Sequence, residues 1–451
     1  MLETDFLSGV VEGFYGRPWS QEQRLHLFGE MAAFGLNTYF YAPKYDLKHR
    51  AVWRQPYDDS ELMSLCELVQ ACEQNGLNFI YGLSPGLDIR FSDQADVDHI
   101  QSRFEQLRKL GVRHFALLFD DLPLQMGDAG RRAGQSLAAA HCEVTNAVYD
   151  WAREQSAASR FLFCPTPYCE RMDGAALGGV RYLDEVGQLL QPEIDVLWTG
   201  PEIVSQEITV ESVERITARI GRRPVIWDNI FANDYDMRRL FCGPYSGRPR
   251  ELRRAVGGIL INPNNEYPIN FIPLRTFARF LAGEGPWQPR EAFLKAVSEW
   301  LPYFETVNQP LAPEDLVLLA DCFYLPHEDG SQAARLLALI DRLLAESIDA
   351  WGESYEEFSV MNARIQALFD RLTELRDREL FDAWSRRIWA LKEELLVIEA
   401  ALAAKRAGRE LAGGMEVDHY LPGTFRGGIL AKLERLLSID AEGKIRPRAI
   451  A

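Results

Sequence analysis

The stretch HFALLFDDLP, residues 114–123, runs from a short apolar segment directly into two adjacent aspartates, Asp120 and Asp121. The apolar part is rich in aromatic residues and follows a helix-like segment that ends at Gly111, which is typical of a buried strand. Two neighbouring carboxylates each raise the pKa of the other, so the pair is costly. An isolated pair of this kind is most often a solvated turn, because acidic residues usually lie on the surface.

Seven more apolar runs follow the same pattern, at residues 8–14, 36–43, 77–85, 160–167, 195–201, 223–229 and 257–264. Segments with helical periodicity lie between most of them, at residues 20–35, 59–76, 94–110, 136–155, 209–220 and 268–282. Several of these segments end in a glycine that suits a left-handed helix end, namely Gly35, Gly76, Gly111 and Gly221. Strand and helix thus alternate eight times over roughly 280 residues, which predicts an α/β fold of the (β/α)8 TIM-barrel type, whose usual size is about 250 residues.

The rival architecture is an open, doubly wound parallel sheet. Such a sheet usually carries a Gly-rich phosphate loop after its first strand, and the segment VVEGFYGRPWS at 10–20 does not fit the GxGxxG pattern. We therefore expect a catalytic barrel over residues 1–285. After it helix formers dominate, as in EAFLKAVSEWLPYF at 291–304, so we expect an α-helical bundle over 286–412. A C-terminal tail, 413–451, begins with a Gly-rich break.

Composition narrows the class of partner. The chain has 451 residues and a net charge of −17, which disfavours nucleic acid and anionic membranes as partners. No apolar stretch reaches the roughly 18 residues that span a membrane, and we see no signal peptide at the first residues. The seven cysteines are scattered without a CxxC pair, and the histidines form no HExxH motif. We therefore expect free thiols in the cytoplasm, no metal site and no cofactor.

Active sites of such barrels lie at the carboxyl ends of the strands. The residues that follow the predicted strands are polar, aromatic or ionisable: Glu12, Gly13, Phe14, Tyr15, Lys44, Asp120, Asp121, Tyr168, Trp198, Thr199, Gly200, Trp227, Asn229, Asp234, Asn262 and Asn264. Taken singly, most Asn and Asp residues at such positions are turn formers. Their convergence on one rim favours a functional site.

This rim is rich in Asp, Asn, Trp and Tyr and poor in His and Cys, which suits a sugar and does not support Ser/His or Cys/His nucleophilic catalysis. Most glycosidases use two carboxylates about 5–9 Å apart on opposite sides of the bond, and adjacent aspartates could be too close for that. An adjacent pair better suits a substrate that supplies its own nucleophile. Two alternatives stay open: an inactive barrel that binds glycans, or a glycosidase with Glu12 or Asp234 as its nucleophile.

Five segments carry a resemblance to a known family: GVVEGFYGRPWS at 9–20, YFYAPKYDLKHR at 39–50, LLFDDLP at 117–123, WDNIFANDYDMRRLFCGPY at 227–245 and GGILINPN at 257–264. In this order they resemble glycoside hydrolase family eighty-four, the O-GlcNAcases and related bacterial β-N-acetylglucosaminidases, over about residues 5–285. The resemblance implies a retaining mechanism in which the acetamido oxygen of the substrate attacks the anomeric carbon and forms an oxazoline.

The resemblance also implies a role for each matching residue. Asp120 would orient and polarise the acetamido N–H, and Asp121 would act as general acid and then general base. The substrate-binding residues would be Tyr168 and Asn229 at the acetamido group, Gly13, Lys44, Asp234 and Asn262 at hydroxyls or the N-acetyl carbonyl, and Trp227 in the pocket wall.

The implied partner is a GlcNAc-bearing glycan or an O-GlcNAc-modified protein. The aglycone stays open between protein Ser/Thr, a chitin fragment and a hyaluronan-type glycan. The helical region resembles the family's stalk domain, through which some members form homodimers.

Overall fold

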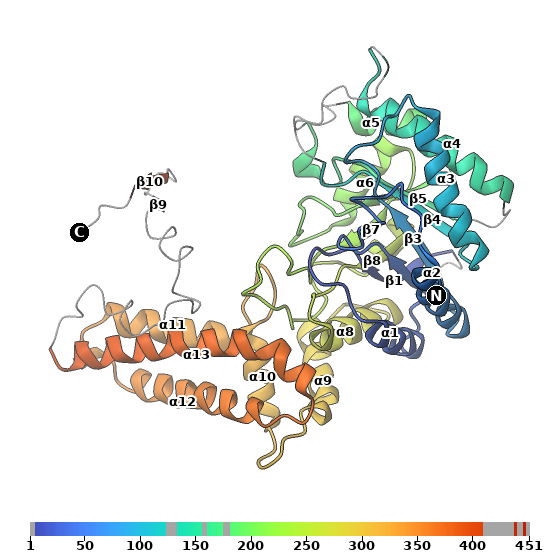
Figure 1. The fold of residues 1–451 in the computed structure, drawn as a ribbon. Helices are drawn as coiled ribbons and strands as arrows, with labels where there is room; N and C mark the ends of the chain where they lie inside the picture. The colour runs from blue at the N-terminus through green and yellow to red at the C-terminus, as the bar shows by residue number, and fades with distance from the viewer. Residues whose placement is uncertain are drawn as a thin grey trace. The chain divides into compact units, whose positions relative to one another are not determined.

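The computed structural model describes residues 5–122, 132, 134–155, 160–174, 181–408, 437–439 and 445–447. Eight parallel strands close into a barrel in sequence order, with β8 paired to β1 (Figure 1). They are β1 (Leu7–Glu12), β2 (Thr38–Tyr41), β3 (Asn78–Leu83), β4 (His114–Leu118), β5 (Phe161–Cys164), β6 (Asp195–Trp198), β7 (Val225–Asp228) and β8 (Gly258–Ile261). The predicted fold class, a TIM barrel followed by helices, is confirmed.

Helices follow the strands along the chain: α1 (Gln21–Ala33), α2 (Asp59–Gln74), α3 (Gln94–Lys109), α4 (Leu137–Gln155), α5 (Tyr182–Leu189), α6 (Val210–Ile220), α7 (Leu252–Ala255) and α8 (Phe271–Ala282). Capping boxes start α1 and α2, with Ser20 bonded to Gln23 and Asp58 to Glu61. The predicted helix-end glycines all have positive φ, as expected: Gly35, Gly76, Gly111 and Gly221. The sequence missed α5 and α7, because 8 and 4 residues are too short to show a clear period.

The inside of the barrel is a packed apolar core. Its buried side chains include one from each of the eight strands, namely Val11, Phe40, Ile80, Leu118, Leu162, Leu197, Val225 and Leu260. Close packing of this kind leaves little freedom to the strands, so it fixes the positions at which they end.

The chain divides into two compact units, Met1–Tyr303 with Ala320–Gly330, and Phe304–Leu319 with Ser331–Ala451. The remaining helices are α9 (Pro289–Trp300), α10 (Pro313–Cys322), α11 (Ser331–Ala345), α12 (Ser354–Thr373) and α13 (Arg378–Arg406). The predicted limit at 285/286 assigned α9 to the helical domain, but α9 belongs to the barrel unit. It stays there because Trp300 stacks on Phe271 of α8, with ring centroids 5.9 Å apart.

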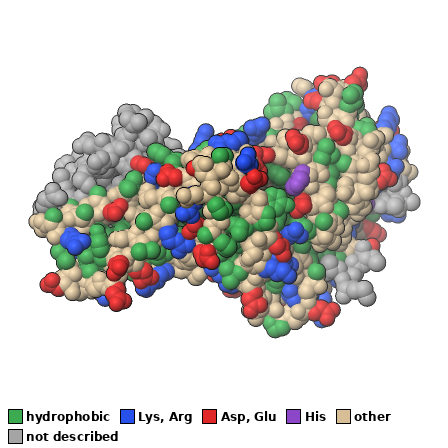
Figure 2. All heavy atoms as spheres, turned by 90° about the horizontal axis from the view of Figure 1, so that it is seen from below, with side chains coloured by type: hydrophobic (Ala, Val, Ile, Leu, Met, Phe, Trp, Pro, Cys, Tyr) green, Lys and Arg blue, Asp and Glu red, His purple; other side chains and the backbone are tan. Residues whose placement is uncertain are grey.

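The predicted tail at 413–451 lies outside the described residues except for β9 (Leu437–Ile439) and β10 (Ile445–Pro447), which pair antiparallel. On the face drawn in Figure 2, acidic and basic side chains are interspersed among hydrophobic ones. Within the described ranges, no helix has both the length and the apolar character that a membrane span requires.

Candidate active site

The nine residues to which the family resemblance gave a catalytic or binding role line one cavity of about 330 Å³ at the carboxyl ends of the strands, here called the pocket. They are Gly13, Lys44, Asp120, Asp121, Tyr168, Trp227, Asn229, Asp234 and Asn262. Strands β1, β2, β4, β5, β7 and β8 deliver them, since each residue lies at the end of a strand or in the segment that follows it. The convergence expected from strand ends therefore exists.

A turn of the backbone brings Asp120 and Asp121 into the same pocket. Successive residues of a strand point to opposite faces, so two adjacent carboxylates would normally diverge. Asp121 has a φ of 49°, and no other non-glycine residue in the described part of the chain has a positive φ. This left-handed conformation ends the alternation directly after Asp120, and both side chains line the pocket.

The carboxylate of Asp120 is paired with a cation. Lys44 Nζ lies 2.5 Å from its Oδ2, and the two side chains are only 1% and 9% exposed. Burial opposes ionisation, but the charges of Lys44 and Arg50 and the hydrogen bond from Lys44 hold the pKa of Asp120 below its usual range. Its second oxygen, Oδ1, is buried and accepts no hydrogen bond from the described residues. Asp120 is thus ionised, and its Oδ1 can accept a hydrogen bond from a bound substrate.

Asp121 accepts hydrogen bonds from two phenols instead. Tyr168 donates to its Oδ1 at 2.6 Å, and Tyr15 donates to its Oδ2 at 3.0 Å. Burial and the neighbouring carboxylate raise the pKa of both tyrosines above the ordinary value, so both remain protonated donors. The two aspartates therefore have different surroundings, an ammonium for Asp120 and neutral donors for Asp121.

The amide side chains of Asn229 and Asn262 form another part of the pocket wall. Asn262 Nδ2 donates to Asn229 Oδ1 at 2.9 Å, and Asn229 Nδ2 donates to the carbonyl of Ile203 at 2.8 Å. Oδ1 of Asn262 is buried and accepts no hydrogen bond from the described residues. The wall thus offers a fixed acceptor for a hydroxyl or amide hydrogen.

Asp234 and Trp227 border the same cavity. The backbone N–H of Tyr15 donates to Asp234 Oδ2 at 2.8 Å, and burial raises the pKa of Asp234. Gly13 is required beside Trp227, because a Cβ at this position would lie 2.0 Å from Cζ2 of the indole. The ring is thereby pressed against the backbone of the first loop and forms a rigid apolar wall.

Three further pocket residues were predicted for the rim but given no role: Tyr15, Trp198 and Thr199. The remaining ones were not predicted: Cys164, Leu197, Ile203, Val204, Ala232 and Tyr235. Four predicted rim residues do not line the pocket: Glu12, Phe14, Gly200 and Asn264. Tyr15 and Trp198 both follow predicted strands. The position of the Tyr15 phenol, two residues after Gly13, could have indicated a role in the site. Apolar residues such as Ile203 and Val204 carry no such signal, since their sequence pattern is that of ordinary core.

Glu12, one of the two alternative nucleophiles, is fully buried and does not line the pocket. Arg24 donates to both of its oxygens at 2.7 and 2.8 Å, and Tyr39 and the backbone N–H of Trp19 complete its hydrogen bonds. The carboxylate therefore ties α1 to the barrel and has no free oxygen for catalysis.

A TIM barrel whose rim joins paired carboxylates to aromatic and amide side chains is an arrangement that suits a glycoside hydrolase. The family model described as beta-N-acetylglucosaminidase matches residues 8–312, and the chain belongs to this family. The predicted family resemblance is thereby confirmed.

Named relatives agree with this assignment. Protein O-GlcNAcase of Rattus norvegicus is 48% identical over 273 residues, which cover 60% of this chain and 30% of that protein. Protein O-GlcNAcase of Mus musculus matches with the same identity and coverage, 48% over 273 residues. The chain thus spans about 30% of the length of these curated relatives. A mutant of the Thermobaculum terrenum O-GlcNAc hydrolase is similar in structure, with 27% identity, a TM-score of 0.76, and coverage of 88% of this chain and 83% of that chain.

Proposed function

We propose that this chain is a retaining β-N-acetylglucosaminidase that removes terminal β-linked GlcNAc by substrate-assisted catalysis, with O-GlcNAc on protein Ser/Thr as its substrate class. The O-GlcNAcases among its relatives support this choice of substrate. The observation that carries the mechanism is the unequal aspartate pair: Asp120 is held ionised by Lys44, while Asp121 is held by two phenols.

In the first step, Oδ1 of Asp120 accepts the hydrogen bond of the acetamido N–H, which makes the acetamido oxygen a better nucleophile. That oxygen attacks the anomeric carbon, the glycosidic bond breaks, and the oxazoline ring forms in its N-protonated, cationic form, with its N–H still bonded to Asp120. Asp121 donates its proton to the departing oxygen. A carboxylic acid in this role contributes about 10²–10⁴-fold when the leaving group is poor.

In the second step, Asp121 is a carboxylate and removes a proton from water. The water oxygen attacks the anomeric carbon from the face that the aglycone left, and the oxazoline opens to the acetamide. The configuration is retained because the anomeric carbon is inverted twice. Tyr168 and Tyr15 keep the Asp121 side chain in place through both steps.

The remaining residues bind the sugar. Oδ1 of Asn262 and the carboxylate of Asp234 accept hydrogen bonds from hydroxyls, and Asn229 fixes the Asn262 amide. Trp227 supplies the apolar wall for the acetamido methyl and the ring C–H groups. Gly13 leaves the space that the indole needs.

The test is the hydrolysis of aryl β-N-acetylglucosaminides with zero to three fluorines on the acetyl methyl. Fluorine weakens the acetamido oxygen as a nucleophile and leaves the aryl group unchanged, so kcat/KM should fall steeply along the series. A flat series would mean that a protein carboxylate attacks, with Asp234 the remaining candidate. No turnover of the unsubstituted compound would favour a glycan-binding barrel.

The location and the assembly are further parts of this proposal. All seven cysteines are free thiols, which supports a reducing compartment such as the cytoplasm. A homodimer formed through the helical domain stays a prediction, and the mass of the whole chain in solution tests whether a dimer forms.

A further inference from the structure

The loop between β2 and α2 carries another basic residue, Arg50, whose role the proposed mechanism leaves open. Lys44 lines the pocket, but Arg50, at the end of the segment YFYAPKYDLKHR, does not. Arg50 is nevertheless buried, 7% exposed. Its charge helps to lower the pKa of Asp120, but within the described residues its hydrogen bonds go to groups other than carboxylates. A buried guanidinium without a carboxylate partner is costly, so its hydrogen bonds need an explanation.

Arg50 bonds to the backbone of the aspartate pair. One guanidinium nitrogen, Nη2, donates to the carbonyl oxygen of Asp121 at 3.0 Å. The other, Nη1, donates to Oγ of Ser84 at 3.2 Å, at the end of β3. The guanidinium therefore links the segments after β2, β3 and β4, and its contact with Asp121 falls on the residue that has the left-handed conformation.

This contact bears on catalysis because the conformation of Asp121 is unfavourable in itself. In the left-handed region the Cβ of any residue other than glycine crowds the backbone, so a surrounding contact must maintain it. Without the turn, strand geometry would direct Asp120 and Asp121 to opposite faces. We propose that Arg50 is a positioning residue, which holds the Asp121 carbonyl and with it the turn that aims the Asp121 carboxyl group into the pocket. This inference rests on the proposed function, since it assigns Arg50 to the same reaction.

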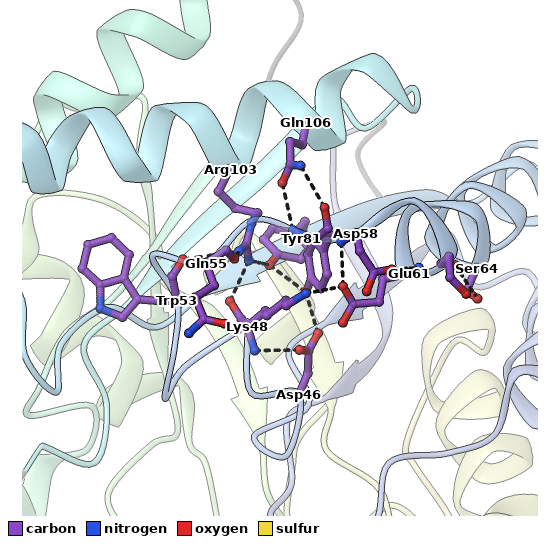
Figure 3. A network of polar contacts seen from close by, with 12 residues as sticks. Asp46, Lys48, Trp53, Gln55, Asp58, Glu61, Ser64, Tyr81, Arg103 and Gln106 are labelled. Carbon is purple, nitrogen blue, oxygen red and sulfur yellow. Dashed lines mark hydrogen bonds and ion pairs between the residues drawn. The ribbon is translucent and has the colours of Figure 1, made fainter.

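Hydrogen bonds from α3 hold in place the loop that carries Arg50. Arg103, 2% exposed, donates to the carbonyls of Lys48 at 2.6 Å and Trp53 at 3.3 Å, and also to the carbonyl of Gln55. Figure 3 shows Arg103 among these groups, with the hydroxyl of Tyr81 at 3.1 Å beside them. The bonded carbonyls lie on both sides of Arg50 in the sequence, so Arg103 restrains the loop before and after it.

Two more contacts make the loop a rigid support. Asp46 accepts hydrogen bonds from the hydroxyl of Tyr57 at 2.5 Å and from the backbone N–H of Lys48 at 2.9 Å. Gln106 of α3 accepts a hydrogen bond from the backbone N–H of Tyr57 and donates one to its carbonyl, each at 3.2 Å. Arg50 is thus held on a preformed loop and can hold Asp121 in turn.

The test compares two substrates with different leaving groups, 4-methoxyphenyl and 2,4-dinitrophenyl β-N-acetylglucosaminide. The first variant, Arg50→Met, removes the hydrogen-bond donors of the side chain. The second, Arg50→Lys, keeps a positive charge and one donor nitrogen. The matched control is Arg54→Gln, which removes an arginine from the same loop whose partners, Asp88 and Asp96, do not line the pocket. Circular dichroism and thermal unfolding report the folded fraction of each variant.

Displacement of the general acid lowers the rate most when the leaving group is poor and must receive a proton. Arg50→Met should therefore lower kcat by about 10- to 100-fold on the methoxyphenyl substrate and much less on the dinitrophenyl substrate. Arg50→Lys should recover part of that loss, and Arg54→Gln should show no preference between the substrates. A merely structural role lowers the active fraction and reduces both rates by the same factor.

Equal losses on both substrates, or no loss, would overturn the inference. If Arg50→Met does not fold, Arg50→Lys is compared on the same two substrates. We then expect a smaller loss that is confined to the methoxyphenyl substrate, and an equal loss on both substrates would refute the inference. The wild-type enzyme separates the two proposals. If it cleaves neither substrate, the proposed function fails and this inference falls with it, whereas an active wild type with an unselective Arg50→Met removes only the role of Arg50.

Discussion

Removal of the ammonium beside Asp120 tests the electrostatic design of the pocket. In Lys44→Met, the carboxylate loses a cation 2.5 Å from its Oδ2, at a site where neither side chain is more than 9% exposed. Two unit charges at 4 Å attract by about 4 kcal/mol at an effective dielectric constant of about 20. Removal of one partner from a buried pair typically costs about 3–5 kcal/mol. Arg50 still lies near Asp120 and compensates in part, so the lower end applies, or about 100-fold in kcat/KM.

The pH profile separates this effect from a general loss of activity. The pKa of Asp120 is held low by Lys44, Arg50 and His49, against the cost of burial. Burial lowers the pKa of His49 to about 4, so this ring is neutral near pH 7 and Lys44 is the dominant close cation. Without Lys44 the pKa of Asp120 rises, Asp120 takes up its proton at a higher pH, and the acidic limb of kcat/KM moves to higher pH.

The control is Lys48→Met, which removes a lysine of the same loop that pairs with Glu61 and does not line the pocket. Its acidic limb should coincide with that of the wild type. An acidic limb that stays in place in Lys44→Met, at whatever rate, would refute the reasoning, because ionisation of Asp120 would then not depend on its closest cation. A change confined to KM would instead leave Lys44 a sugar-binding residue only.

Three further predictions concern the acid and the wall of the pocket. Asp121→Asn should lower kcat by about 10²–10⁴-fold on poor leaving groups and far less on activated aryl groups, and equal losses in parallel assays would remove its role as acid. Tyr168→Phe deletes a 2.6 Å hydrogen bond to Asp121 and should cost about 10- to 100-fold in kcat/KM, so an unchanged value would place the phenol outside the mechanism. Gly13→Ala puts a methyl 2.0 Å from the Trp227 indole, so KM should rise and tryptophan fluorescence should change, and wild-type values for both would contradict the close packing.

The sequence predicts the barrel and many of the polar residues of its pocket because both depend on local patterns. Each strand is a short apolar run, and each is followed by polar residues whose meeting point is set by the parallel arrangement. Asn229 and Asn262 could therefore be assigned to one site from chain segments 33 residues apart, and they are hydrogen-bonded in the structure. The pattern needs no knowledge of side-chain partners.

The partners themselves could not be predicted, because they depend on contacts between distant segments. Lys44 and Asp120 are 76 residues apart, and Tyr15 and Asp121 are 106 apart. The motif that contains Arg50 was visible, but its bond to the Asp121 carbonyl requires the geometry of three strand ends. For Glu12 the local pattern was misleading. Its position at a strand end suggested a possible nucleophile, but its hydrogen bonds with Arg24 and Tyr39 give it a structural role.

The adjacent aspartates explain why the substrate must provide the nucleophile under the proposed mechanism. Consecutive residues that enter one pocket through a single turn approach the sugar from the same side, so they cannot flank the glycosidic bond as acid and nucleophile. The turn at Asp121 places them together, and their partners then differentiate them: Lys44 for Asp120, phenols for Asp121. One carboxylate can act on the acetamido group and the other on the leaving oxygen, because in a β-linked substrate both groups are reached from that side of the ring. The adjacent carboxyl groups, one ionised and one protonated when the bond breaks, are thereby the feature that the chemistry uses.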